Sequence, residues 1–260
     1  MKRLSIFIVG IMVAVVAMSR TFDMKLLGAD AKGIKSCTEL INRTIEKAAS
    51  EGGGTIYFPA GTYLTATIHM KSNITLYLES GAILRFSDKF EDYLPFVTLR
   101  WEGTVMKSLS PLIYAHSADN VTISGRGTLD GNGLKWWLWE FDTRKVIKEN
   151  GGKLPALDKL QQMWVDANKD LEISDYYKPS LERRMFRPPF IQFYECTNIL
   201  IENVKIINSP FWTINPAFCD NVTIHGVTIN NPSSDPKGPN TDGINPSSCR
   251  NVRISDCFIS

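Results

Sequence analysis

Asp242 is the residue of this chain whose type and position most directly suggest chemistry. It lies in the run Asn240-Thr-Asp-Gly243, and the other members of the surrounding sequence repeat carry no acidic residue there. A carboxylate in a fixed loop can exchange a proton during a reaction, whereas an aspartate in a turn can also simply bind its own backbone. The preceding residues 233–239 favour the first interpretation, because they lengthen this loop by seven residues. We therefore expect a reactive site at Asp242.

The repeat around Asp242 consists of a turn asparagine followed by a short apolar strand. Its members are Asn73-Ile-Thr-Leu, Asn120-Val-Thr-Ile, Asn198-Ile-Leu-Ile, Asn221-Val-Thr-Ile and Asn251-Val-Arg-Ile. The last three asparagines lie 23 and then 30 residues apart, and a second alternating run begins six residues after each. Units of this size with a period of two are typical of a parallel β-solenoid, in which each coil buries its apolar face against its neighbours.

Composition and charge restrict the class of protein. The chain has 260 residues, 43% of them hydrophobic, which is enough for a core of its own. Residues 1–19 have the basic start, apolar run and small residues near the cleavage site that are typical of a signal peptide. Removing them leaves 27 of the 29 basic residues against 27 acidic ones, which argues against a nucleic acid partner. We expect residues 20–260 to form one monomeric domain, secreted or periplasmic, with no membrane contact in the mature form.

Three of the five cysteines recur in the repeat. Cys196, Cys219 and Cys249 each stand two residues before the asparagine of their unit, so stacked coils would place them side by side. A metal site is one interpretation, and a buried ladder of small apolar side chains is the one we favour. An oxidising compartment would also allow a disulfide between neighbouring coils. The three histidines are scattered without metal-ligand spacing, so we expect neither a metal nor a cofactor.

Two segments depart from the repeat. Ser36-Cys-Thr-Glu39 resembles a capping box, and the apolar spacing that follows predicts a helix over residues 36–49 that covers the open end of the solenoid. Residues 134–189 predict a partly helical insertion, rich in tryptophan, that folds over one face. Its tryptophans either stack on sugar rings above a cleft or bury one another in a small satellite core.

Several motifs together resemble glycoside hydrolase family 28, the polygalacturonases and rhamnogalacturonan hydrolases. The matching runs are Leu27-Gly-Ala-Asp-Ala-Lys-Gly33, Gly52-Gly-Gly-Thr-Ile-Tyr-Phe-Pro-Ala-Gly-Thr-Tyr63, Ser209-Pro-Phe-Trp212 and Asn240-Thr-Asp-Gly243. The resemblance extends from about Lys25 to Ser260, apart from the insertion. It implies an all-β fold, a right-handed parallel β-helix of the pectin-lyase-like type. It also implies a secreted enzyme that cleaves pectic polysaccharide, an α-1,4-galacturonide, with inversion by an aspartate cluster.

The resemblance also assigns roles to residues. Asp242 matches the aspartate that activates water, with Asn240 as a hydrogen-bonding neighbour that also binds substrate. Trp212 and Asn245 match substrate-binding positions, although family members often have an aspartate where Asn245 stands. The family's remaining aspartates belong to a Gly-Asp-Asp run one coil later, and the given sequence ends at Ser260 before it. We therefore expect a domain truncated at its C-terminal end, inactive as these 260 residues alone.

Three alternatives stay open from the sequence. Rhamnogalacturonan is a second substrate for the same hydrolytic chemistry. A β-elimination lyase on the same scaffold would need calcium-binding acidic residues and a basic proton abstractor, and would release unsaturated products. A non-catalytic carbohydrate-binding solenoid would need no carboxylate cluster.

Overall fold

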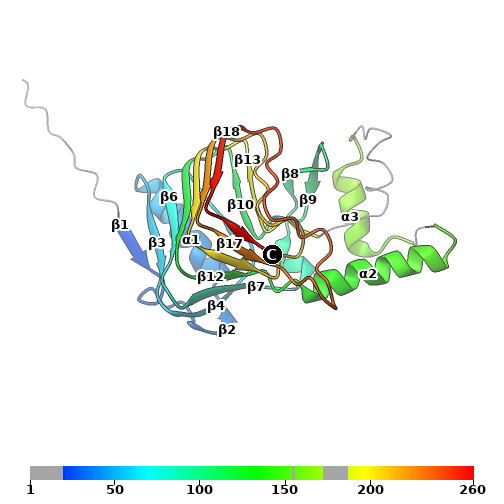
Figure 1. Ribbon diagram of the computed structural model, residues 1–260, viewed down its shortest axis with the longest axis horizontal. Coiled ribbons are helices and arrows are strands. Elements are labelled where there is room, and N and C mark those ends of the chain that lie inside the picture. The colour runs from blue at the N-terminus through cyan, green and yellow to red at the C-terminus, as the bar shows by residue number, and fades with distance from the viewer. Residues whose placement is uncertain (1–19, 154–155, 172–186) are drawn as a thin grey trace, which may run out of the picture.

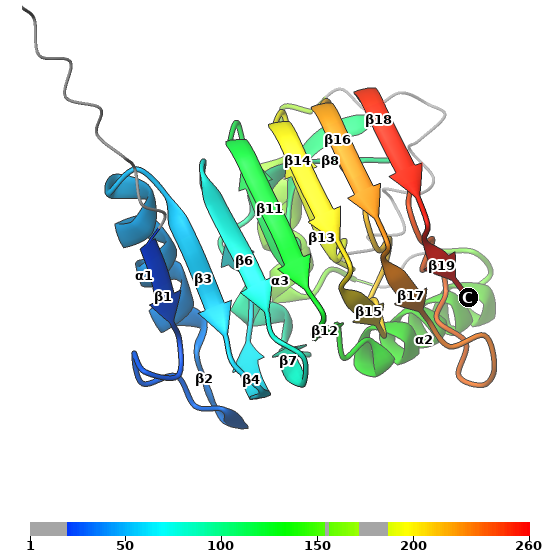
Figure 2. The same cartoon turned by 60° about the vertical axis from the view of Figure 1, so that its left-hand side comes forward.

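The computed structural model describes residues 20–153, 156–171 and 187–260, so the predicted signal peptide lies outside the described residues. Three parallel sheets wind around one apolar core (Figures 1 and 2). The first sheet contains β1 (Arg20–Asp23), β3 (Gly54–Phe58), β6 (Ile74–Leu78), β11 (Asp119–Gly125), β14 (Thr197–Glu202), β16 (Asp220–His225) and β18 (Arg250–Ser255). The second contains β2 (Lys32–Ser36), β4 (Gly61–Thr65), β7 (Ala82–Phe86), β12 (Thr128–Asp130), β15 (Lys205–Ile207), β17 (Thr228–Asn230) and β19 (Phe258–Ile259).

The third sheet is the shortest and carries the site. It contains β5 (Ile68–His69), β10 (Ile113–His116) and β13 (Ile191–Tyr194). Single parallel bridges continue it from Ile191 to Ile214 and from Ile214 to Ile244. An antiparallel hairpin of β8 (Val97–Trp101) and β9 (Thr104–Ser108) lies beside it (Figure 1). The prediction of an all-β right-handed parallel β-helix is confirmed.

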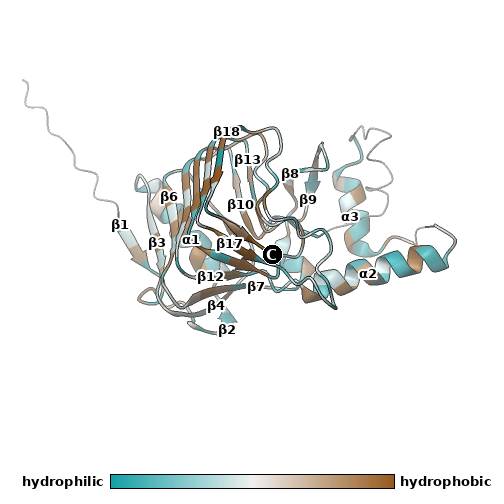
Figure 3. Cartoon of the chain, viewed as in Figure 1, coloured by the Kyte–Doolittle hydropathy of each residue, from teal (hydrophilic) through white to brown (hydrophobic). Residues whose placement is uncertain are grey.

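The alternating sequence explains the stacking of the coils. Ile56, Leu76, Ile123, Ile201 and Ile224 pair in register on successive strands of the first sheet, and all are at most 1% exposed. Figure 3 shows apolar residues concentrated on these strands. Because every coil adds its apolar side chains to one continuous stack, the core grows along the solenoid axis rather than around a centre.

Asparagine side chains form a second stack at the turn before this sheet. Asn73, Asn120, Asn198 and Asn221 all have left-handed backbone conformations, with φ between 54° and 62°. The side-chain amide of Asn120 donates to Asn73 Oδ1 at 2.9 Å, and that of Asn221 donates to Asn198 Oδ1 at 2.7 Å. Asparagine tolerates this conformation and can bond to its equivalent one coil away, which explains its recurrence. The predicted turn asparagines are confirmed.

Helix α1 (Thr38–Ser50) covers the start of the third sheet. Its Asn42 side chain accepts from the backbone N–H of His69 at 2.8 Å and donates to the carbonyl of Thr67 at 2.9 Å. An amide side chain thus satisfies the free edge of β5 as a further strand would. The predicted capping box is wrong: Cys37 is the N-cap and makes no side-chain cap bond, because Ser36 belongs to β2 and pairs with Leu64 of β4.

Cys196, Cys219 and Cys249 pack in the core, as the apolar ladder that we favoured requires, although Cys249 is only half-buried. Cys196 and Cys219 are at most 1% exposed, and all five cysteines carry free thiols. The Cys219 thiol donates to the carbonyl of Phe193 at 3.1 Å. Within the described residues, no group of three or more histidine, cysteine or acidic side chains has the arrangement of a metal site.

Among the described residues, the remaining helices are η1 (Phe90–Tyr93), α2 (Leu134–Glu149) and α3 (Lys159–Ala167), and α2 extends away from the coils (Figure 1). Trp136 of α2 is fully buried, with its ring 4.4 Å from Phe90 and 5.6 Å from Tyr93. Asn168, at the end of α3, exchanges two 2.8 Å bonds with the backbone of Lys107 in the hairpin. Trp136 is therefore unavailable to a sugar ring, but it packs against Phe90 and Tyr93 in the main core, not against other tryptophans in a satellite core. None of the helices in the described ranges is long and apolar enough to cross a membrane.

Candidate active site

Asp242 is exposed at the end of the third sheet, on a backbone that the preceding coil holds in place. The N–H of Thr213 donates to the carbonyl of Asp242 at 2.8 Å, and the N–H of Ile214 donates to the carbonyl of Gly243 at 3.0 Å. The N–H of Asn245 returns a bond to Ile214 at 2.9 Å. These backbone hydrogen bonds fix the position of the Asp242 backbone relative to the preceding coil and leave its carboxylate open to solvent.

Asn231, which the sequence analysis did not identify, supports the same loop from inside. Its side-chain oxygen accepts from the N–H of Ser209 at 2.8 Å. Its side-chain amide donates at 3.1 Å to both the hydroxyl of Thr213 and the carbonyl of Thr241. One 7% exposed side chain therefore joins three coil segments directly beneath the residue before Asp242.

Asn240 is held from the other side by two arginines. Its backbone is left-handed, with φ of 56°. Its side-chain oxygen accepts from Arg187 Nη2 at 2.8 Å and from Arg144 Nη2 at 3.4 Å. Arg187 also donates through Nη1 to the carbonyl of Pro210 at 3.1 Å and to that of Pro239 at 2.5 Å. The Asn240 side chain is thus part of the loop support, whereas its role as a hydrogen-bonding neighbour of Asp242 stays a prediction.

Both arginines depend on Glu140, a fully buried residue of α2. Arg144 Nε donates to Glu140 Oε1, and Arg187 Nε lies 3.7 Å from Glu140 Oε2. Burial lowers the pKa of Arg187 to about 10, while the attraction of Glu140 opposes this fall. Arg187 is therefore a buried cation whose charge is balanced by Glu140, from the other end of the insertion. Arg144 is a half-exposed cation.

Trp212 and Asn245 line one small pocket of about 170 Å³, together with Arg100 and Glu102 of the hairpin. The pocket is positioned by Gln192, which is fully buried. The Gln192 side chain accepts from the N–H of Arg100 and donates to its carbonyl, both at 3.0 Å. Trp212 and Asn245 therefore meet in one place, beside a cation, Arg100, that the sequence analysis had missed, whereas Asn240 does not line this pocket.

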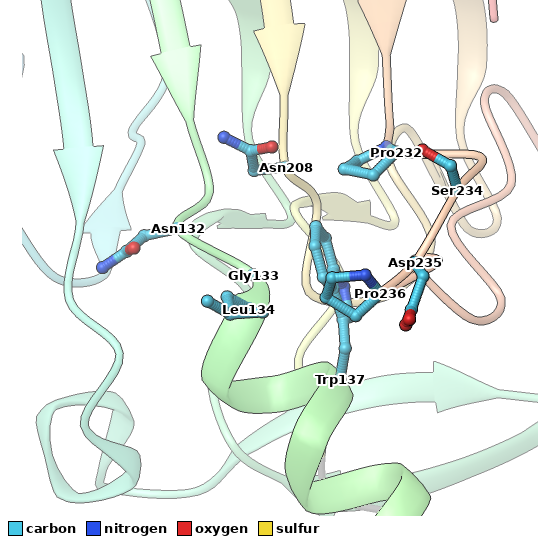
Figure 4. Close-up of a pocket in the computed structure, with 9 residues that line it drawn as sticks. All are labelled: Asn132, Gly133, Leu134, Trp137, Asn208, Pro232, Ser234, Asp235 and Pro236. Carbon is cyan, nitrogen blue, oxygen red and sulfur yellow. The ribbon is translucent and has the colours of Figure 1, made fainter.

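A second pocket of about 400 Å³ lies between the start of α2 and the lengthened loop (Figure 4). Trp137 forms one wall, and its indole N–H donates to the carbonyl of Ser209 at 2.9 Å. Pro232 and Pro236 also line this pocket, and Pro236 lies next to Trp137 in the view of Figure 4. None of the four predicted site residues lines this pocket, so we do not include it in the candidate site.

The predicted residues fall into two neighbouring groups. Asn240 and Asp242 share one loop, whereas Trp212 and Asn245 share the pocket beside the hairpin. Five supporting residues were missed by the sequence analysis: Arg100, Glu140, Arg144, Arg187 and Asn231. The only sequence signal for Glu140 was an acidic residue in a tryptophan-rich helical segment. Nothing in the sequence indicates that Glu140 contacts Arg187.

Comparison with known proteins agrees with this geometry. The family model described as glycosyl hydrolases family 28 matches residues 176–260, and one described as rhamnogalacturonase A/epimerase, pectate lyase-like, matches residues 22–99. A probable polygalacturonase of Vitis vinifera is 31% identical over 220 residues, which cover 83% of this chain and 36% of that protein. An endo-polygalacturonase of Pectobacterium carotovorum subsp. carotovorum is 27% identical over 259 residues, which cover 93% of this chain and 54% of that protein.

A solved structure gives the same answer. The hyperthermoactive exopolygalacturonase from Thermotoga maritima superposes with a TM-score of 0.73 at 36% identity, covering 92% of this chain and 52% of that one. The chain thus spans between about a third and about a half of the length of these relatives. The repeat, the loop of Asp242 and these similarities lead to one conclusion: the chain belongs to glycoside hydrolase family 28.

Proposed function

We propose that this chain is part of a hydrolase that cleaves pectic polysaccharide at α-1,4-linked galacturonic acid with inversion. The observation that carries the proposal is the exposed carboxylate of Asp242 on a backbone fixed by the preceding coil. Such a group can take a proton from water as that water attacks a sugar carbon. Inverting hydrolases keep their two carboxyl groups ~6.5–9.5 Å apart so that the water fits between them. Of the described residues, we assign only Asp242 to the reacting groups.

The charges around the site favour an anionic polymer. Arg100 lines the pocket of Trp212 and Asn245, and the half-exposed side chain of Arg144 lies beside Asn240. Guanidinium groups suit carboxylates because their parallel N–H donors match the two oxygens. The uronate carboxylates of polygalacturonate would meet these arginines. The half-buried ring of Trp212, which stacks on Phe211 and Trp101, would offer its remaining exposed surface to a sugar ring.

Rhamnogalacturonan is the second candidate substrate. It is supported by the match of residues 22–99 to the rhamnogalacturonase A/epimerase description. That segment forms the first coils, away from the loop of Asp242, so we rank it below polygalacturonate. We also propose that the protein is monomeric and is exported to the periplasm or the cell exterior, where such polymers are found.

The test uses the full-length gene product with polygalacturonate and rhamnogalacturonan supplied separately. We expect new reducing ends from polygalacturonate and, by proton NMR of the first products, the anomer opposite to that of the substrate. Retention of configuration would contradict the single-displacement role of Asp242. Unsaturated products that absorb ultraviolet light would indicate a lyase, and binding without cleavage would indicate a carbohydrate-binding solenoid.

A further inference from the structure

We propose that Glu140 is a positioning residue that acts through Arg187 and Arg144 on Asn240, and so fixes the loop that carries Asp242. The inference rests on the proposed function. It assigns a role in the site to the insertion, which departs from the coil repeat.

The contacts form an uninterrupted series from α2 to the loop. The side chains of Glu140 and Arg187 are 0% and 1% exposed, whereas that of Arg144 is 50% exposed. Arg187 places Nε toward Glu140 and uses both terminal nitrogens on the carbonyls of Pro210 and Pro239 and the side chain of Asn240. Its guanidinium also lies over the ring of Phe211, 4.7 Å from the centroid. The orientation of this one guanidinium therefore depends on α2 and on the loop together.

The packing of α2 against the coils does not require the buried carboxylate of Glu140. Trp136 and Trp137 already anchor the helix, the first against Phe90 and the second on Ser209. A buried ion pair rarely adds stability over apolar packing, yet losing one partner leaves an uncompensated charge. Glu140 Oε2 and Arg187 Nε make no hydrogen bond although both atoms are buried, so their contact is chiefly electrostatic. This contact orients the guanidinium of Arg187, and so sets where its N–H donors point.

The loop that carries Asn240 and Asp242 depends on contacts from outside itself to hold its conformation. Asn240 is exposed and left-handed, and it follows the seven added residues of the lengthened loop. Without the arginines, its side-chain oxygen would lose the two donors described above. Displacing a reacting group by about 1 Å can reduce a rate by about 10²-fold. Because Asp242 is two residues from Asn240, a shift of this loop would displace its carboxylate.

The test compares Glu140→Gln with Asp142→Asn in the full-length gene product. Both variants neutralise one carboxylate of α2, but Asp142 is exposed and serves as the matched control. We expect Glu140→Gln to lower kcat on polygalacturonate by about 10- to 100-fold with little change in KM, and Asp142→Asn to leave both unchanged. Equal effects of the two variants would overturn the proposal.

Double substitution separates positioning from general stability. If Glu140 acts through Asn240, then Glu140→Gln should cause no further loss of kcat in an Asn240→Ala background. Fully multiplicative losses would overturn the proposal. If Glu140→Gln does not fold, Arg144→Gln replaces it in the same cycle with the same two outcomes, because that half-exposed side chain is removed at lower cost.

A third readout does not require activity. Hydrogen exchange should accelerate at the amides of Gly238 and Asn245 in Glu140→Gln but not in Asp142→Asn. In the wild type these amides donate to Pro232 and Ile214. Unchanged exchange would overturn the positioning role. If the wild-type protein cleaves no pectic polymer while the exchange result holds, the proposed function fails and the positioning of the loop stands.

Discussion

Replacing Asn231 by alanine is the perturbation whose effect follows most directly from the structure. The substitution removes three hydrogen bonds at once, to Ser209, Thr213 and Thr241. Ser209 is fully buried, so its backbone N–H would lose its acceptor in a place that water reaches poorly. The Thr213 hydroxyl can rotate, and the half-buried carbonyl of Thr241 can bind water.

The magnitude follows from the single group that stays unpaired. An orphaned buried donor costs about 1–3 kcal/mol, and each ordinary hydrogen bond lost adds about 0.5–1.5 kcal/mol. Counting one orphaned donor and one ordinary bond gives a destabilisation of about 1.5–4.5 kcal/mol. For a domain of this size, that corresponds to a fall in Tm of roughly 3–18 °C.

The assay is thermal unfolding followed by circular dichroism, with Asn230→Ala as the control. Asn230 is the last residue of β17 and directly precedes Asn231, but it is exposed, so its removal should change Tm by no more than about 1 °C. Asn231→Ala should also lower activity, because the carbonyl of Thr241 loses its support. A Tm for Asn231→Ala within about 1 °C of the wild type would refute this reasoning.

Three further predictions concern other parts of the chain. Gly125→Ala should prevent folding, because a Cβ there would lie 2.0 Å from a backbone oxygen of the previous coil. Gly151 also has a positive φ but has open space around it, so Gly151→Ala should lower the free energy of unfolding by only about 1–2 kcal/mol. Soluble yield and Tm would distinguish the two variants. Burial and then repulsion by Lys71 lower the pKa of His69 below 6.5, so the protein should lose stability as the pH falls below 6.5. His69→Phe should reduce that loss, and an unchanged dependence of Tm on pH would contradict the assignment. Gln192→Leu should release the hairpin at Arg100, which faster proteolysis within residues 97–108 would detect and an unchanged cleavage pattern would rule out.

The coils could be predicted from the sequence because their information is local. A turn asparagine such as Asn221 and the alternating residues after it specify both the left-handed turn and the buried face of one strand. The register with the next coil follows, because a shift by one residue would expose the apolar set. The same reasoning predicted a lengthened loop beside Asp242 and a stack of cysteines on successive coils.

The rest depended on contacts between distant segments. The local sequence at Ser36 matches a capping box, yet Ser36 pairs with β4 as part of a strand, so the helix begins at Thr38. Glu140 and Arg187 lie at opposite ends of an insertion without periodicity, so no pattern indicates that they meet. Nor does any pattern indicate that Gln192 binds the backbone of the hairpin. The supporting residues of the site were therefore visible only in three dimensions.

The most direct test of the central claim is the rate of polygalacturonate cleavage by Asp242→Asn in the full-length gene product. Asp256→Asn is the matched control, since Asp256 is exposed in the turn between β18 and β19, with a left-handed backbone that asparagine also tolerates. Loss of a positioned acid–base group lowers a rate by about 10²–10⁴-fold. We predict a loss of that size for Asp242→Asn, with wild-type binding of substrate, and no change for Asp256→Asn. Cleavage by Asp242→Asn at the wild-type rate would contradict the proposal that this aspartate activates water.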